Sequence, residues 1–183
     1  MSTLKQHYQK TILPELKTKL GRENIFEVPK ITKVTLNVGL SAKKDPKFMD
    51  VIVDTLRRVS GQAPVKTLAR KSIAGFKVRE NMVVGAMVTL RGEQMWNFVE
   101  KLVHVAFPRV RDFRGIPENA IDSTGNFHYG FREHTAFPEV GTKEIESIHG
   151  VQVSITSTAK SHEEGVALFK ALGFPFKTDE NEK

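Results

Sequence analysis

Five basic side chains and no acidic one occur in the fourteen residues KTLARKSIAGFKVR (66–79). The basic residues are Lys66, Arg70, Lys71, Lys77 and Arg79. Lysine and arginine make strong charge-assisted hydrogen bonds to phosphate, so this density is typical of a segment that binds nucleic acid. The alternative is a flexible loop whose charge maintains solubility, but such a loop does not need the apolar Ile73 and Phe76. We therefore predict a basic finger that reaches phosphate groups.

Aromatic side chains could add base stacking to these charges. For Phe76 two interpretations stay open: an anchor in the core at the base of the loop, and a stacking contact with a nucleotide. Phe127, Tyr129 and Phe131 alternate along the chain. This alternation fits a strand with its aromatic side chains in the core better than a set of stacking residues. Trp96 lies on the apolar side of a predicted helix, and we expect it in the core.

The positive charge is concentrated in the first half of the chain. The formal net charge is +7 and the isoelectric point is about 9.6. Residues 1–80 contain 17 Lys and Arg against 7 Asp and Glu, a net of +10, whereas residues 81–183 contain 11 against 14, a net of −3. A domain with an isoelectric point above about 9 is typical of nucleic-acid binding. One half of the chain could therefore face a polyanion.

The remaining residue types give little support for catalysis. The chain contains no cysteine, which excludes disulfides, thiol catalysis and metal sites with cysteine ligands. Phosphate-loop, dinucleotide-binding and nucleophile-elbow motifs are also absent from the sequence. Glu144 and Glu146 are close in sequence but flank a short loop or strand, so we do not expect a catalytic carboxylate pair. Six histidines have no spacing typical of metal ligands: His7, His104, His128, His134, His149 and His162. We predict a protein that is not an enzyme and has no metal or cofactor.

Periodicity predicts the elements that position the basic stretch. Apolar residues at helical spacing predict helices over 3–20, 46–60, 93–107 and from 161 to 172. Alternating residues predict strands over 31–39, 63–68, 83–91, 127–131 and 151–158. Pro14 should kink or split the first helix. Residues 69–82 then form a connection of about 14 residues between two strands, a length at which loops without secondary structure are usually functional or disordered.

This order of elements predicts an α+β fold, a ferredoxin-like or RRM-like antiparallel sheet with helices on one face. We expect residues 1–183 to form a single domain. The other face of the sheet would be open and largely polar, with Lys33, Thr35, Asn37, Met87, Thr89 and Gln152. An open polar sheet face is a frequent platform for RNA. No run of about 18 apolar residues occurs, so we expect a cytoplasmic protein with no membrane partner.

Several longer motifs resemble one family. The run LRRVSGQAPVKTLARKSIAGFKVR (56–79) resembles the signature of large-subunit ribosomal protein number five, the 5S-rRNA-binding family. VTLNVG (34–39), FRGIPENAIDSTGNFHYGFREHTAFPEV (113–140) and ALGFPF (171–176) resemble the same family, and the motifs occur in the family's order. The resemblance covers nearly the whole chain. It implies a ribosome-bound structural protein of bacterial type.

The resemblance also implies partners and contact residues. Members lie in the central protuberance of the large subunit, with 5S rRNA, 23S rRNA and other ribosomal proteins as partners. Matching the motifs carries the 5S rRNA contacts to Lys33, Asn37, Gln62, Phe76 and Thr89. The long loop of the family reaches tRNA in the peptidyl site, and it corresponds here to Arg70, Lys71, Ser72 and Lys77. Members also form an intersubunit bridge with a head protein of the small subunit, which corresponds to Arg109, Arg111, Arg114 and Arg132.

Two other functions stay open. A free-standing RNA-binding regulator or chaperone would bind many folded RNAs with no preference for 5S rRNA. A ferredoxin-like enzyme acting on a phosphorylated substrate would need a compact acid–base or phosphate-binding constellation, and the sequence contains none. The structural RNA-binding protein is the interpretation that we favour.

Overall fold

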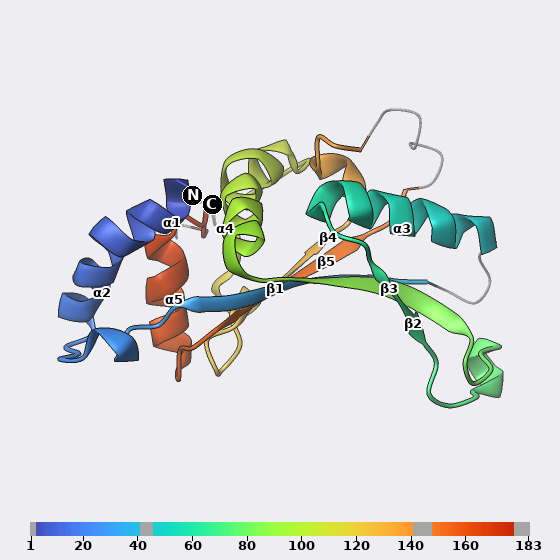
Figure 1. Ribbon diagram of the computed structural model, residues 1–183, viewed down its shortest axis with the longest axis horizontal. Coiled ribbons are helices and arrows are strands. Elements are labelled where there is room, and N and C mark those ends of the chain that lie inside the picture. Colours follow the sequence, from blue (N-terminus) through green and yellow to red (C-terminus); the bar gives the residue numbers. More distant parts are fainter. Residues whose placement is uncertain (1–2, 41–45, 141–147, 178–183) are drawn as a thin grey trace. The chain divides into compact units, whose positions relative to one another are not determined.

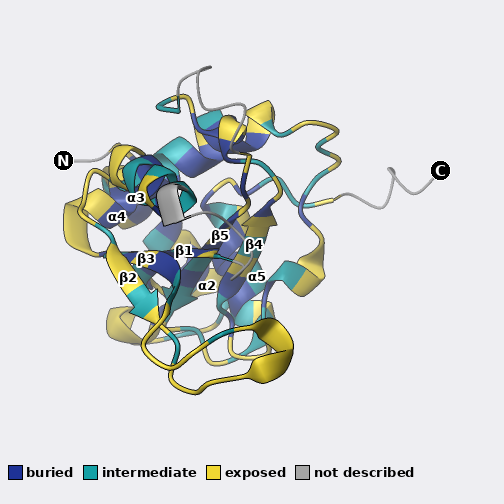
Figure 2. Cartoon of the chain, turned by 90° about the vertical axis from the view of Figure 1, so that its right-hand side faces the viewer, coloured by how far each residue is buried: buried dark blue, intermediate teal, exposed yellow. Residues whose placement is uncertain are grey.

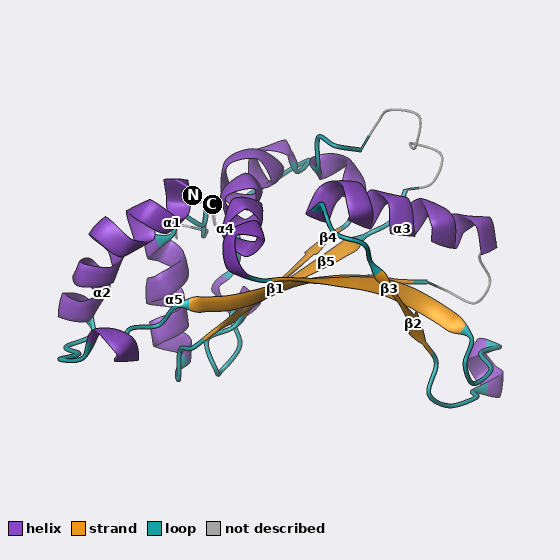
Figure 3. Ribbon diagram, viewed as in Figure 1, coloured by secondary structure: helices purple, strands orange, loops and turns teal. Residues whose placement is uncertain are grey.

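The computed structural model describes residues 3–40, 46–140 and 148–177. Its strands are β1 (Ile31–Gly39), β2 (Val65–Leu68), β3 (Val83–Leu90), β4 (Phe127–Phe131) and β5 (Val151–Ser157). Its α-helices are α1 (Thr3–His7), α2 (Leu13–Lys19), α3 (Pro46–Ser60), α4 (Gly92–Lys101) and α5 (His162–Ala171). The strands form one sheet in the order β2-β3-β1-β5-β4 (Figures 1 and 3). This architecture confirms the predicted α+β class with an antiparallel sheet.

The chain divides into two compact units, and each is described separately. Unit 1 comprises Met1–Val34, Arg91–Tyr129 and Ser154–Lys183, and unit 2 comprises Thr35–Leu90 and Gly130–Val153. The strands β1 and β5 each contribute residues to both units. That residues 1–183 form a single domain stays a prediction. Within the described ranges, no helix is both long and apolar enough to cross a membrane.

Two predicted helices change their helical type just before a proline. The first helical region runs from α1 through a π-helical turn, η1 (Tyr8–Ile12), into α2, and the amide of Leu13 donates to the carbonyl of Tyr8, five residues earlier. The helix predicted over 93–107 is α4 followed by a π-helical turn, η4 (Leu102–Ala106). Pro14 and Pro108 lack an amide hydrogen, and a proline ring clashes with the carbonyl four residues before it. The wider turns give that carbonyl room, so the helical region continues through Pro14 into α2 and is not split there.

Unit 1 has an aromatic core. Phe107, Phe127 and Phe169 are fully buried, and the rings of Phe127 and Phe169 lie 5.3 Å apart between centroids. Trp96 is 7% exposed, which confirms its predicted place in the core. The hydroxyl of Tyr8, packed against Trp96, donates to the carbonyl of Pro29 at 2.9 Å. Burial raises the pKa of Tyr8 to about 12.

Unit 2 places one helix on one side of its strands. Figure 1 shows α3 lying against β1 and β3, and Ile52 and Leu56 of α3 are fully buried together with Leu36 of β1. Fully burying such an apolar side chain contributes about 1.5–3 kcal/mol. In the described part of unit 2, no other helix longer than one turn covers the opposite side of these strands. The side chains on that opposite side are therefore available for contact.

Candidate nucleic-acid interface

The uncovered side of the strands in unit 2 is called here the open sheet face. The side chains of the open sheet face alternate with buried side chains along each strand. In β1, Val34, Leu36 and Val38 are buried, whereas Thr35 and Asn37 are half-buried. Cross-strand pairing extends the face to β2 and β3, since paired residues point to the same side of a sheet. The face consists of Thr35, Asn37, Val65, Thr67, Met87, Thr89 and Gln152. It is mostly uncharged and offers hydroxyl and amide groups.

A glycine lets the strands of the open sheet face approach closely. A Cβ atom at Gly85 would lie 2.5 Å from the carbonyl oxygen of Val38 and 2.9 Å from the Thr67 hydroxyl. Both atoms belong to neighbouring strands, so any side chain here would push β1 and β2 away from β3. The absence of a side chain at Gly85 therefore allows the close contact between these strands.

Lys66 lies on the other side of the sheet. It pairs with the buried Ala86 of β3, and its ammonium group is 3.5 Å from the carboxylate of Asp50 on α3. Lys66, which was expected just before the basic loop, therefore lies on the same side of the sheet as α3 and not on the open sheet face. The side of the sheet on which Lys66 lies could not be predicted from the sequence, because the direction of a side chain on a short strand depends on the pairing register.

The basic loop between β2 and β3, residues 69–82, has a defined internal structure. The amide of Ala69 donates to Met82 at 2.8 Å, and that of Asn81 donates back to Ala69 at 2.9 Å. Farther out, Ile73 and Val78 exchange two hydrogen bonds of 2.9 and 3.2 Å. These bonds close the loop twice along its length, which argues against the interpretation of a flexible solubilising loop.

The tip of the basic loop presents both charge and an aromatic ring. A single 3-10 turn, η3 (Ala74–Phe76), ends at Lys77, whose φ of 55° is left-handed. Phe76 is 73% exposed, so its interpretation as a core anchor is wrong, and the stacking contact with a nucleotide stays a prediction. Arg70, Lys71 and Lys77 are exposed, and Figure 2 shows most of this loop in the colour of exposed residues.

The other residues expected to contact RNA lie in different local settings. Ser72 is exposed, and its hydroxyl accepts a hydrogen bond of 2.8 Å from the amide of Glu80, so it also holds the loop together. Gln62 is exposed in the connection between α3 and β2, where its backbone amide donates to the Ser60 hydroxyl. Lys33 is half-buried in the part of β1 that belongs to unit 1.

The arginines expected at the intersubunit bridge fall in two groups. Arg109, Arg111 and Arg114 are exposed in unit 1, whereas the exposed Arg132 belongs to unit 2. Two hydrogen bonds hold the first group in place: the amide of Ile116 donates to Pro175, and that of Lys177 donates to Ile116. The C-terminal segment therefore anchors the arginine-rich turn of unit 1.

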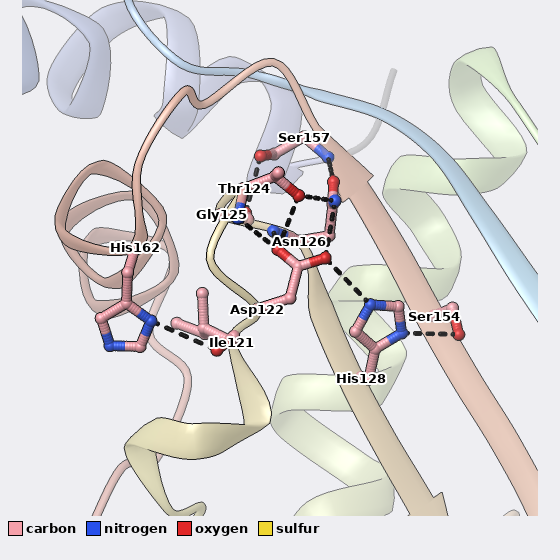
Figure 4. A network of polar contacts seen from close by, with 9 residues as sticks. All are labelled: Ile121, Asp122, Thr124, Gly125, Asn126, His128, Ser154, Ser157 and His162. Atoms are coloured by element: carbon pink, nitrogen blue, oxygen red, sulfur yellow. Dashed lines mark hydrogen bonds and ion pairs between the residues drawn. The ribbon is translucent and has the colours of Figure 1, made fainter.

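A polar network at the start of β4 was missed in the sequence (Figure 4). The Asp122 carboxylate accepts hydrogen bonds of 2.8–2.9 Å from the amides of Thr124 and Asn126, the Thr124 hydroxyl and the Asn126 side chain. Partial burial raises the pKa of Asp122, but hydrogen bonds from Asn126, Thr124 and His128 outweigh it, so the pKa lies well below its ordinary value. The sequence signal was the run DSTGN, since an Asp before such residues typically bonds to backbone amides two or more positions later.

The histidines and acidic residues within the described ranges are not grouped as metal ligands. Among the residues the structure describes, no group of three or more His, Cys, Asp or Glu side chains is arranged to hold a metal ion. His134 and His149 are buried and stack on one another, with ring centroids 4.2 Å apart. Glu144 and Glu146 lie outside the described residues.

Comparison with known proteins identifies the family. The family model described as "Ribosomal protein L5" matches residues 24–79, and the model of the C-terminus of the same ribosomal family matches residues 83–176. A protein of Francisella tularensis subsp. novicida, "Large ribosomal subunit protein uL5", is 49% identical over 97% of this chain and 100% of its own length. The protein of the same name from Francisella philomiragia is 48% identical over the same shares of the two chains. The chain therefore belongs to the ribosomal protein L5 family, whose members are non-enzymatic structural constituents of the large ribosomal subunit.

Proposed function

We propose that the chain binds 5S rRNA through the open sheet face of unit 2. The observation that carries this proposal is the contrast between the two sides of the strands. One side is buried under α3, whereas the other presents half-buried or exposed Asn37, Thr89 and Gln152. Neutral donors and acceptors on a sheet suit the 2′-hydroxyl and backbone groups along an RNA helix, which are recognised by shape more than by base sequence.

Charged residues next to the face supply affinity and register. Lysine and arginine contacts to phosphate give most of the binding free energy and fix orientation. Lys33 is the charged contact in this proposal, the neutral Gln62 adds a hydrogen-bonding amide, and Phe76 adds an exposed ring that can stack on a base. Family membership, which makes rRNA a partner, supports these assignments.

The basic loop contacts tRNA in the peptidyl site. Arg70, Lys71 and Lys77 provide dispersed positive charge, and dispersed phosphate contacts are individually weak, which suits a tRNA that must leave at each cycle. Ser72 positions the loop through its bond to Glu80. The proposal thus gives the loop a transient partner and the sheet a permanent one.

The exposed arginines contribute to an intersubunit bridge. Arg109, Arg111 and Arg114, with Arg132, face a head protein of the small subunit in this proposal, and the chain lies in the central protuberance beside 23S rRNA and other ribosomal proteins. As a component of the ribosome the protein is cytoplasmic in bacteria. Exposure of all four side chains supports their availability for contact.

The substitution Asn37→Ala tests the sheet-face contact. We expect weaker binding of a 5S rRNA transcript at matched salt, because the Asn37 amide can both donate to and accept from RNA and alanine can do neither. Its half-buried position predicts little change in the free energy of unfolding. Unchanged binding of the folded variant would show that the contact surface lies elsewhere.

A free-standing RNA regulator or chaperone is the second candidate, because basic proteins bind many RNAs without specificity. Competition separates the two functions. Unlabelled 5S rRNA should displace labelled 5S rRNA more effectively than equal amounts of other folded RNAs do. Equal displacement by all competitors would favour the regulator or chaperone.

A further inference from the structure

One histidine in unit 1 is fixed in orientation while half of its side chain is exposed. His128 lies on β4 between the aromatic residues Phe127 and Tyr129, so it points to the opposite side of the strand. Its side chain is 47% exposed. Figure 4 shows the imidazole between two partners: Nδ1 is 3.1 Å from the Ser154 hydroxyl, and Nε2 is 3.5 Å from the Asp122 carboxylate.

The chemistry of the partners determines the roles of the two nitrogens. An ionised carboxylate only accepts, so Nε2 carries the hydrogen and donates to Asp122. Nδ1 then has a free lone pair and accepts from the Ser154 hydroxyl. Both polar atoms of the ring are therefore engaged within the protein, and what the exposed part offers to a partner is the flat face of the ring.

Asp122 is itself held rigidly, so the ring has a firm support. Three hydrogen bonds fix its Oδ1 atom, and the Asn126 side chain donates to Oδ2. Asn126 is tied in turn to β5, where the amide of Ser157 donates to its side-chain oxygen at 3.1 Å. The connection before β4 is thus bound to β5 next to His128.

The order Ser154, His128, Asp122 contains the residue types of a hydrolytic triad, but its chemistry differs. The aspartate of a triad stabilises the imidazolium that forms when the serine loses its proton. Here four other hydrogen bonds already occupy the carboxylate, and the contact to His128 is long at 3.5 Å. The arrangement suits a device that orients a ring better than one that moves a proton.

Unit 1 also presents polar and basic side chains that suit a polyanion. Ser154 and Thr156 of β5 are half-buried, and the basic Lys30 and Lys160 are exposed in the same unit. Lys30 and the segment before Lys160 are joined directly, since the amide of Thr158 donates to Lys30 at 2.9 Å. A flat, oriented aromatic ring on a unit that also carries exposed basic side chains suits the stacking of an unpaired base, because proteins combine such rings with positive charge for this purpose.

We propose that His128 is a stacking platform for an unpaired base of the bound RNA, held in position by Asp122 and Ser154. The proposal rests on the proposed function, because it takes RNA as the partner. It adds His128, in unit 1, to the residues proposed to contact 5S rRNA. It also assigns a role to the partly exposed polar network around Asp122.

Three substitutions of His128 and one matched control test the proposal on the full chain with a 5S rRNA transcript. His128→Ala removes the ring and should weaken binding about 5-fold or more, the lower end expected for one stacked base. His128→Phe keeps a flat ring but loses both hydrogen bonds, and its affinity should stay within about 2-fold of the original chain by the same stacking argument. His7→Ala removes an exposed histidine on α1 and should have no effect.

Fluorescence gives a second readout. The chain has a single tryptophan, Trp96, which is buried. His128→Trp adds an exposed indole whose emission should fall when RNA binds, whereas emission of the original chain should not.

The outcomes separate this inference from the proposed function. Equal binding by His128→Ala and the original chain overturns the inference. So does equal weakening by His128→Ala and His128→Phe, which would mean that the ring nitrogens or the fold matter and the ring face does not. If the original chain shows no preference for 5S rRNA but His128→Ala still weakens RNA binding and His128→Phe does not, the proposed function fails and the platform stands. Absence of all RNA binding overturns both.

Discussion

At the scale of single residues, two glycines in unit 1 decide how closely a helix can approach a loop. A Cβ atom at Gly165, in the first turn of α5, would lie 2.6 Å from the Cα of Gly125 and 2.9 Å from its carbonyl oxygen. Gly125 has a φ of 79°, which favours glycine as well. The connection that contains Asp122 is therefore packed backbone to backbone against α5.

The substitution Gly165→Ala should destabilise the protein, although alanine is ordinarily favoured over glycine in a helix by about 1 kcal/mol. Overpacking typically costs about 1–3 kcal/mol, and here the obstructing atoms are backbone that cannot rotate away. We expect a lower urea midpoint and a thermal midpoint lower by a few degrees. Gly130→Ala is the control, because nothing lies within 4 Å of its added carbon. Equal stability of both variants would contradict the close packing.

Sequence reasoning predicted the environment of some residues and left that of others undecided. It predicted the buried Trp96 from helical spacing, but it could not decide between two environments for Phe76. That choice depends on how the loop closes on itself through Ile73 and Val78, which no local pattern encodes. His128 was counted only as a scattered histidine, because its partner Ser154 is 26 residues away in the chain.

At the scale of elements, the basic loop combines rigidity with charge. Two sets of backbone hydrogen bonds across the loop and the left-handed conformation of Lys77 fix its backbone. The backbone positions that carry the charges are therefore defined before a partner binds. Preorganisation of this kind lowers the entropy lost on binding. The loop is therefore suited to brief contacts that need little rearrangement.

Removing loop charge should change the salt dependence of tRNA binding. Each lysine or arginine contact to a phosphate contributes roughly 0.7–0.9 to the slope of log affinity against log salt. The double substitution Arg70→Gln and Lys71→Gln should therefore flatten the slope by up to about 1.8, the sum of two such contacts. Lys10→Gln with Lys19→Gln removes the same charge from exposed positions in unit 1. The account is contradicted at this scale if the two double variants give the same slope.

Most elements could be predicted from periodicity, and the exceptions have a physical origin. The strand 31–39 and the helix 46–60 were predicted with their observed ends, because alternation and an apolar stripe reflect burial directly. The π-helical turns before Pro14 and Pro108 could not be predicted. A proline indicates only that the regular pattern of hydrogen bonds is interrupted, and it does not indicate whether the helix stops, kinks or widens.

At the scale of the whole molecule, composition and charge pointed to a basic, non-enzymatic RNA-binding protein, and the family confirms a structural constituent of the large subunit. The asymmetry of charge along the sequence does not correspond to the two units, since unit 1 takes residues from both halves. Each unit is assembled from segments that lie far apart in the sequence. This division could not be predicted from the order of elements alone.

The central claim, that RNA covers the open sheet face, can be tested with single thiols because the chain has no cysteine. Met87→Cys places a thiol on the open sheet face, where Met87 is 39% exposed, and Arg57→Cys places one at an exposed position of α3. The rate of alkylation of each thiol is measured with and without saturating 5S rRNA. We predict that the RNA protects the thiol of Met87→Cys and leaves that of Arg57→Cys reactive. Protection of Arg57→Cys with an unchanged rate for Met87→Cys would place the RNA on the helical side and contradict the account.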